Sequence, residues 1–231
     1  MGVEWLIIRG FFIPRLVGGS PCFVEVFSDG KVRDVSGKVY ELLRKFLVEI
    51  ANSKGGLLSP GEVADCIFSF FEGGLPSERR RKHVEAVLER HGFKDCLGGL
   101  RDYWRGLKDF LRLPADTRPG LNFSSLYVHL RETGAIAYCL ASARGFDVER
   151  CQLARLAGLL HDLGKPVDWR RHGVEGERIV RGLLDGVVGE ECLRLVCEGV
   201  RLHHSRGGVP GGVRWLVDVV SEADAAAASG D

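Results

Sequence analysis

The feature that most constrains the fold of this chain is a histidine followed directly by an aspartate, His161 and Asp162. Apolar residues recur at helical spacing over 153–160, so they predict a helix whose buried stripe leads to His161. Gly, Lys and Pro at 164–166 end that helix just after the pair. A buried carboxylate needs a cationic partner. The fold must therefore bring either an arginine or a metal ion to Asp162.

Further histidines and one aspartate surround this pair in the sequence. A lone histidine on an apolar helix face is more often a hydrogen-bonded core residue than a metal ligand, but that explanation weakens as such residues accumulate. Imidazole and carboxylate ligands together suit divalent Mn, Fe, Co, Ni or Zn better than Ca or Mg. The candidate metal ligands are His129, His161, Asp162, His172, His203, His204 and Asp224.

The composition is that of an ordinary globular protein. The 231 residues are 45% hydrophobic and 27% charged, with a net charge of +1, so charge says little about partners. No apolar run approaches the roughly 18 residues of a membrane span, and the N-terminus lacks the pattern of a secretory signal. We therefore expect a cytoplasmic protein that does not enter a membrane. The seven cysteines include no Cys-x-x-Cys pair, which disfavours a cysteine zinc site.

The N-terminal part, residues 1–113, is expected to form a small α+β accessory domain. Short alternating runs over 3–35 predict strands, and helical spacing from Lys38 predicts a helix that ends before 54–56. Ser59-Pro-Gly-Glu62 is typical of a helix start, and a basic helix over 77–90 would follow. This order resembles a winged-helix pattern that carries Arg79–Lys82 toward nucleic acid. Any small α+β domain would give the same pattern.

The C-terminal part, 114–231, is predicted to be helical throughout. Breaker residues over 113–120 mark the expected boundary. Ser124 or Ser125 would cap the first helix, and Asp147 the second, which ends at the His-Asp pair. Three further helices are expected over 172–184, 190–202 and 213–228.

The order His, His-Asp, His, His-His, Asp over about 116–231 resembles the HD superfamily of metal-dependent phosphohydrolases. The resemblance implies an all-α HD-domain helical bundle with two divalent metal ions, Mn, Ni, Co or Fe, with Zn as a further candidate. It implies that Asp162 bridges the two ions, and that Lys165 in His-Asp-Leu-Gly-Lys faces the phosphate. The first ion would be held by His129, His161, Asp162 and Asp224, and the second by Asp162, His172, His203 and His204.

Two segments resemble, more narrowly, the HD nuclease domain of the large subunit of type III CRISPR interference complexes. They are Pro114-Ala-Asp-Thr-Arg, followed by Ser125-Leu-x-x-His129 with Thr133, and the Ala-Asp-x-x-x-x-Ser-Gly ending at Gly230. The resemblance implies a nuclease for single-stranded DNA, a place among the subunits of a CRISPR effector complex, and a role in antiviral defence. That family usually continues into a cyclase-like palm domain, whereas this sequence stops at Asp231.

The leading hypothesis is a nuclease that cleaves phosphodiesters of single-stranded DNA or RNA. Asp162 and Lys165 are its expected catalytic residues, and Trp169 is a candidate for contact with a base. An HD phosphohydrolase of nucleoside phosphates or cyclic nucleotides is the first alternative, and a non-catalytic DNA-binding or scaffolding protein is the second. The expected substrate-binding residues are Lys165, Arg170, Arg171 and Arg206.

Overall fold

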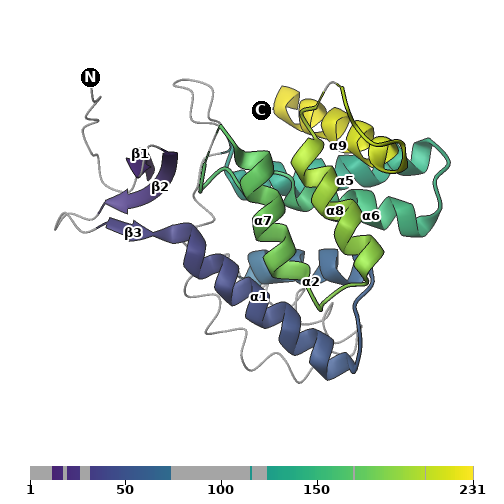
Figure 1. The fold of residues 1–231 in the computed structure, drawn as a ribbon, viewed down its shortest axis with the longest axis horizontal. Helices are drawn as coiled ribbons and strands as arrows, with labels where there is room; N and C mark the ends of the chain where they lie inside the picture. The colour runs from purple at the N-terminus through teal and green to yellow at the C-terminus, as the bar shows by residue number, and fades with distance from the viewer. Residues whose placement is uncertain are drawn as a thin grey trace.

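The computed structural model describes residues 12–17, 20–26, 32–73, 115, 124–168, 170–205 and 207–230. Three short strands, β1 (Phe12–Val17), β2 (Ser20–Val26) and β3 (Val32–Asp34), form an antiparallel sheet in the order β1-β2-β3. The sheet lies at the N-terminal end of helix α1 (Val35–Lys54), which β3 enters directly (Figure 1). Helix α2 (Pro60–Gly73) follows after a short turn.

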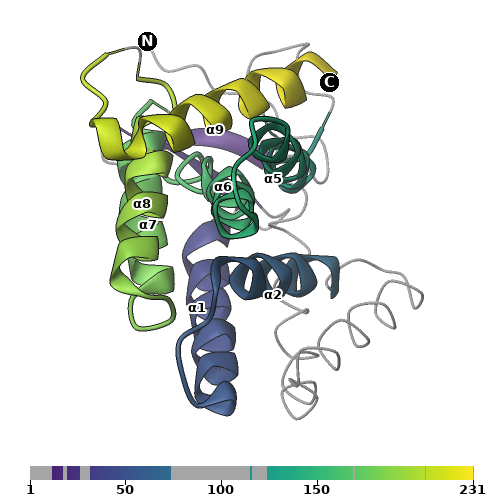
Figure 2. The same ribbon diagram turned by 90° about the vertical axis from the view of Figure 1, so that its right-hand side faces the viewer.

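The remaining described elements are helices, which make the structure mostly helical. They are α5 (Leu126–Ala143), α6 (Val148–Leu160), α7 (His172–Leu184), α8 (Glu190–Leu202) and α9 (Gly211–Gly230). Helix α6 lies in the middle, with α5, α8 and α9 packed around it and α2 beneath it (Figure 2). Helix α7 packs against α8. None of the described helices is long and apolar enough to cross a membrane.

Helices α5 and α6 approach each other closely where both carry glycine. A Cβ atom on Gly158 would lie 3.0 Å from the Cα atom of Gly134 and 3.0 Å from the carbonyl oxygen of Thr133. Larger residues would force the two helices apart. This close crossing brings His129 of α5 next to His161, which follows the last turn of α6, with ring centroids 5.2 Å apart.

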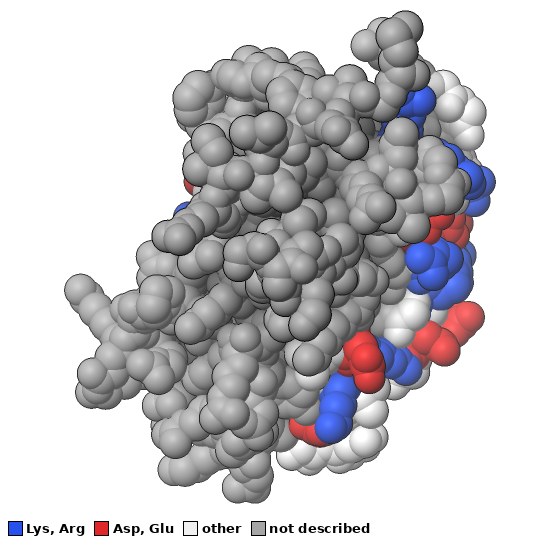
Figure 3. Space-filling model, turned by 90° about the vertical axis from the view of Figure 1, so that its left-hand side faces the viewer, with Lys and Arg blue, Asp and Glu red and all other residues white. Residues whose placement is uncertain are grey.

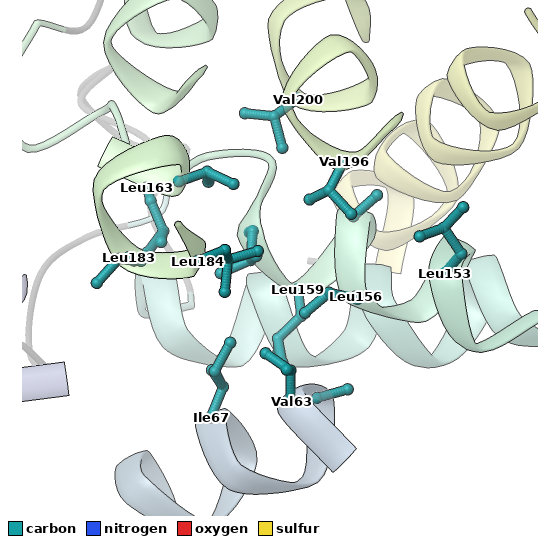
Figure 4. Close-up of a cluster of buried hydrophobic side chains, with 14 of the residues drawn as sticks. Val63, Ile67, Leu153, Leu156, Leu159, Leu163, Leu183, Leu184, Val196 and Val200 are labelled. Atoms are coloured by element: carbon teal, nitrogen blue, oxygen red, sulfur yellow. The ribbon is translucent and has the colours of Figure 1, made fainter. Parts of the chain in front are cut away.

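Helices α1 and α2 share one continuous hydrophobic core with α5–α9. Figure 4 shows Val63 and Ile67 of α2 against Leu156 and Leu159 of α6, with Leu184 of α7 beside them. Polar contacts reinforce this packing. Leu58 donates its backbone N–H to the carbonyl of Val187 at 2.8 Å, and other bonds join Tyr40 to the Leu163 carbonyl, Arg44 to the Leu183 carbonyl and Arg155 to Asp65.

The helix starts predicted from side-chain caps are confirmed. The Glu62 carboxylate accepts from the backbone N–H of Ser59 at 2.7 Å, and the Ser59 hydroxyl accepts from the N–H of Glu62 at 3.3 Å, which is a capping box. The Ser125 hydroxyl caps α5, and the Asp147 carboxylate caps α6 by accepting from the N–H of Arg150 at 2.8 Å. The bounds predicted for α7 and α8 agree with the structure.

The winged-helix prediction for the N-terminal part is not supported. Such a domain needs its own core, whereas α1 and α2 bury their apolar faces against α6 and α7. The basic helix predicted over 77–90, with Arg79–Lys82, lies outside the described residues. The division into 1–113 and 114–231 stays a prediction, because most of the segment around the expected boundary also lies outside them.

Candidate metal centre

The His-Asp pair lies in a compact turn that begins where α6 ends. The backbone N–H of Lys165 donates to the Asp162 carbonyl, and the N–H groups of Val167 and Asp168 donate to the Gly164 carbonyl, all at 3.0 Å. His161 is fully buried, and Asp162 is 1% exposed. The turn therefore holds both side chains inside the bundle.

Four of the predicted ligands form a cluster that we call the inner group: His129, His161, Asp162 and Asp224. One ligand atom from each lies within 4.8 Å of the others. The Asp224 Oδ1 atom is 3.0 Å from His129 Nε2 and 3.3 Å from His161 Nε2. The three other members are buried, and Asp224 is partly buried. Helices α5 and α9 and the end of α6 supply these side chains, as the sequence predicts.

The three other predicted ligands form the outer group: His172, His203 and His204. Their ligand atoms also lie within 4.8 Å of one another. His172 is the first residue of α7, and the other two follow the end of α8. His203 is buried and His204 is exposed, so this group lies nearer the surface than the inner one.

Asp162 lies between the two groups and presents one carboxylate oxygen to each. Its Oδ2 atom is 3.2 Å from His161 Nε2 and 3.6 Å from His129 Nε2. Its Oδ1 atom is 3.4 Å from His172 Nε2 and 3.8 Å from His203 Nε2. A carboxylate placed in this way can bridge two cations.

Two of the imidazole rings are fixed with one nitrogen aimed at the centre. The Nδ1 atom of His161 donates to the Gly158 carbonyl at 2.8 Å, and that of His203 donates to the Val200 carbonyl at 2.7 Å. A carbonyl can only accept, so Nδ1 carries the proton and Nε2 is left for a ligand. Both Nε2 atoms are buried, and that of His161 lies against the carboxylates of Asp162 and Asp224. A divalent cation would satisfy them, so the residues fit a metal site.

The carboxylates and imidazoles shift one another's pKa values. Burial by itself would lower the pKa of His161, but the negative charges of Asp162 and Asp224 outweigh burial and raise it to about 10. Burial would raise the pKa of Asp162, but His161 and Lys165 hold it well below its usual range. Burial and the charge on His161 lower the pKa of His203 to about 3. Without a metal, the inner group thus holds a proton and the buried outer imidazole does not.

The predicted substrate-binding residues are only partly placed. The Lys165 ammonium group forms an ion pair with Asp162 and donates to the Ala115 carbonyl at 3.2 Å. Arg170 and Arg171 are exposed, on the segment that leads into α7. Arg206 and Trp169 lie outside the described residues. Their roles toward substrate stay predictions.

Sequence reasoning missed Asp168, which is 6% exposed. Its Oδ1 atom accepts from the backbone N–H groups of Arg170 at 2.9 Å and Arg171 at 3.1 Å. An aspartate that precedes a helix by a few residues is a known signal for such a turn, so the pattern was available in the sequence.

A mostly helical bundle with two histidine-rich groups around one aspartate defines a class of candidate divalent-metal proteins. Comparison with known proteins makes the class more specific. Residues 126–227 match the family model of the HD domain. The chain is 28% identical to Ribonuclease Y of Symbiobacterium thermophilum over 165 residues. The aligned segment covers 69% of this chain. No solved structure shows a significant match.

These two findings show a likeness to the HD domain over the helical C-terminal part of the chain. The chain spans only 28% of the length of that Ribonuclease Y. Neither comparison shows the predicted link with type III CRISPR complexes.

Proposed function

We propose that this protein is a metal-dependent phosphodiesterase that cleaves single-stranded nucleic acid with two divalent ions. The observation that carries the proposal is the position of Asp162, whose two oxygens face two separate groups of ligands. Two-ion sites are typical of enzymes that cleave phosphodiesters. The name of the relative, Ribonuclease Y, favours RNA as the first substrate to test.

The inner and outer groups would each hold one ion, with Asp162 shared between them. Bound divalent ions of this kind supply Lewis acidity at phosphorus and activate water at neutral pH. The ligand set is rich in imidazole, which suits Mn, Fe, Co, Ni or Zn. The chain's own contribution is to fix the imidazole rings, as the carbonyls of Gly158 and Val200 do.

Lys165 would balance the negative charge of the bound phosphate. Its ammonium group now pairs with the Asp162 carboxylate, so a cation that binds Asp162 would take over that charge. The ammonium group would then be available to an anionic substrate close by. Exposed Arg170 and Arg171 would add contacts to the backbone phosphates of a longer strand.

On the face that Figure 3 draws, the described residues form no broad basic patch. Figure 3 shows basic and acidic side chains side by side in the described part of one face, without a patch of one sign. Along α7, Arg178 pairs with Glu175 at 2.9 Å and Arg181 with Glu177 at 3.2 Å. Contacts with substrate are therefore expected close to the metal centre. A place in a CRISPR effector complex stays a prediction.

The test is cleavage of end-labelled single-stranded RNA and DNA in the presence of Mn, Co or Ni. Asp162→Ala is the inactive variant, and Asp218→Asn, at an exposed position of α9, is the matched control. We expect metal-dependent cleavage by the wild type and the control, and none by Asp162→Ala. Hydrolysis of nucleoside phosphates or cyclic nucleotides without cleavage of either strand would replace the nuclease by the small-nucleotide alternative. No hydrolysis of any of them would favour the non-catalytic alternative.

A further inference from the structure

The two groups of candidate ligands depend on different packing contacts. The inner group comes from α5, α9 and the end of α6, which pack together in the centre of the bundle. The outer group comes from the start of α7 and from the two residues that follow α8. Because His172 is the first residue of α7, its distance from Asp162 depends on how the start of α7 docks against the turn after α6.

Gly164 allows the turn to lie directly against α7. A Cβ atom at this position would be 2.0 Å from the carbonyl oxygen of His172 and 2.6 Å from the backbone nitrogen of Gly176. Both are backbone atoms, so no side-chain rotation could relieve the clash. Any larger residue at position 164 must push α7 away from Asp162.

Gly173 makes the same kind of contact on the other side of α7. Its Cβ atom would be 2.7 Å from the carbonyl oxygen of Arg201, in the last turn of α8. That turn leads directly to His203 and His204. Gly164 and Gly173 therefore fix the first turn of α7 between the turn after α6 and the end of α8.

Asp168 completes this arrangement from within the connecting segment. Its backbone N–H donates to the Gly164 carbonyl at 3.0 Å, and its Oδ1 atom accepts from the N–H groups of Arg170 and Arg171. The carboxylate thereby sets the direction of the chain one residue before His172. An asparagine could make the same bonds through its side-chain oxygen, whereas an alanine could not.

We propose that Gly164, Gly173 and Asp168 are positioning residues for the outer metal ion. They hold His172 against Asp162, and so decide whether the protein binds one ion or two. This inference rests on the proposed two-ion function. The inner group does not include α7, so its ion remains when the start of α7 is displaced.

The test counts metal ions instead of measuring cleavage. The 231-residue protein is loaded with Mn, desalted and analysed by mass spectrometry for metal per chain, with electron paramagnetic resonance on the same samples. Gly164→Ala and Asp168→Ala should fall from two ions to one and show the spectrum of an isolated ion. The wild type should hold two ions and show the spectrum of a coupled pair.

Two control variants separate positioning from general damage. Gly182→Ala changes an exposed glycine of the same helix, where a Cβ atom meets nothing within 4 Å, and it should retain both ions. Asp168→Asn keeps the accepting oxygen and should also retain both. Failure of Asp168→Asn to retain them would contradict the role assigned to that oxygen.

The outcomes distinguish this inference from the proposed function. A wild type with a single ion would contradict the two-ion function, and this inference with it. Two ions in the wild type and also in Gly164→Ala and Asp168→Ala would overturn the inference alone. Loss of both ions from these variants, with unchanged circular dichroism, would overturn it too. If Gly164→Ala fails to fold, the metal count of Asp168→Ala alone tests the inference.

Discussion

The inner and outer groups share Asp162 but differ in charge, burial and origin. The inner group contains two carboxylates and is mostly buried, whereas the outer group adds three imidazoles, one of them exposed. Opposite charges attract more strongly in a buried, less polar environment. We therefore expect the inner ion to bind first and tightly, and the outer ion to exchange with solvent more readily. The same aspartate can thus serve two positions of different affinity.

The largest effect is expected from Asp162→Ala, because this change removes the residue that the two groups share. Both metal affinities should fall, and cleavage should drop by more than about 100-fold, since even changes beyond the ligands cost 10–100-fold. Calorimetric titration with Mn and the cleavage rate would measure this. Retention of the outer ion at wild-type affinity would contradict the shared role.

Single-ligand variants should separate the two groups. His172→Ala should lose the outer ion and keep the inner one, whereas His129→Ala should weaken the inner ion directly. The activity loss should be about 10–100-fold or more in both. Metal counting on the two variants side by side would test this. The comparison fails if the two variants show the same stoichiometry and the same affinities.

The pH dependence of metal binding should show that the inner group loses a proton when it binds an ion. His161 holds a proton in the metal-free protein because its pKa is raised to about 10, and an ion at Nε2 must displace it. Affinity for the inner ion should thus rise about tenfold per pH unit between pH 7 and pH 9, if one proton is released. Calorimetry in two buffers of different ionisation enthalpy would count the protons. Release of no proton on metal binding would be incompatible with a pKa of about 10 for His161.

The same raised pKa affects stability without metal. A histidine whose pKa is higher in the folded state stabilises the fold fully below its unfolded value of 6.5, and this contribution disappears as pH rises through about 10. Metal-free protein should therefore lose stability toward alkaline pH. Protein loaded with metal should lose less, because the ion replaces the proton.

The smallest effect is expected from Tyr40→Phe in α1. The Tyr40 hydroxyl donates to the carbonyl of Leu163, next to Asp162 in the sequence. Loss of this bond should cost about 1 kcal/mol of unfolding free energy and leave both ions in place. Urea unfolding of the metal-free protein would measure it. Loss of a metal ion from Tyr40→Phe would mean that α1 helps to form the metal centre itself.

Local signals predicted much of this fold from the sequence. The starts of three helices were predictable from the type of the capping side chain alone. The capping residues are Ser59, Ser125 and Asp147. The seven candidate ligands were also found from residue type and order, and the structure brings them together in two groups. Their role as ligands remains a prediction.

Local sequence signals do not predict contacts between residues far apart in the chain. Tyr40 lies 123 residues from Leu163, so nothing near it in the sequence indicates that α1 packs against the turn after α6. The α+β pattern of the N-terminal part resembles a winged helix as much as any small α+β domain, and the winged-helix interpretation is the one that the shared core does not support. Gly164 was interpreted as a helix breaker, because only the packed structure reveals its contact with His172.

The most direct test of the two-group centre is a crystal structure of the Mn-loaded protein with anomalous scattering data. Two anomalous peaks are predicted on either side of the Asp162 carboxylate, one among His129, His161 and Asp224 and one among His172, His203 and His204. A single peak shared by both groups, or no peak at Asp162, would contradict the account.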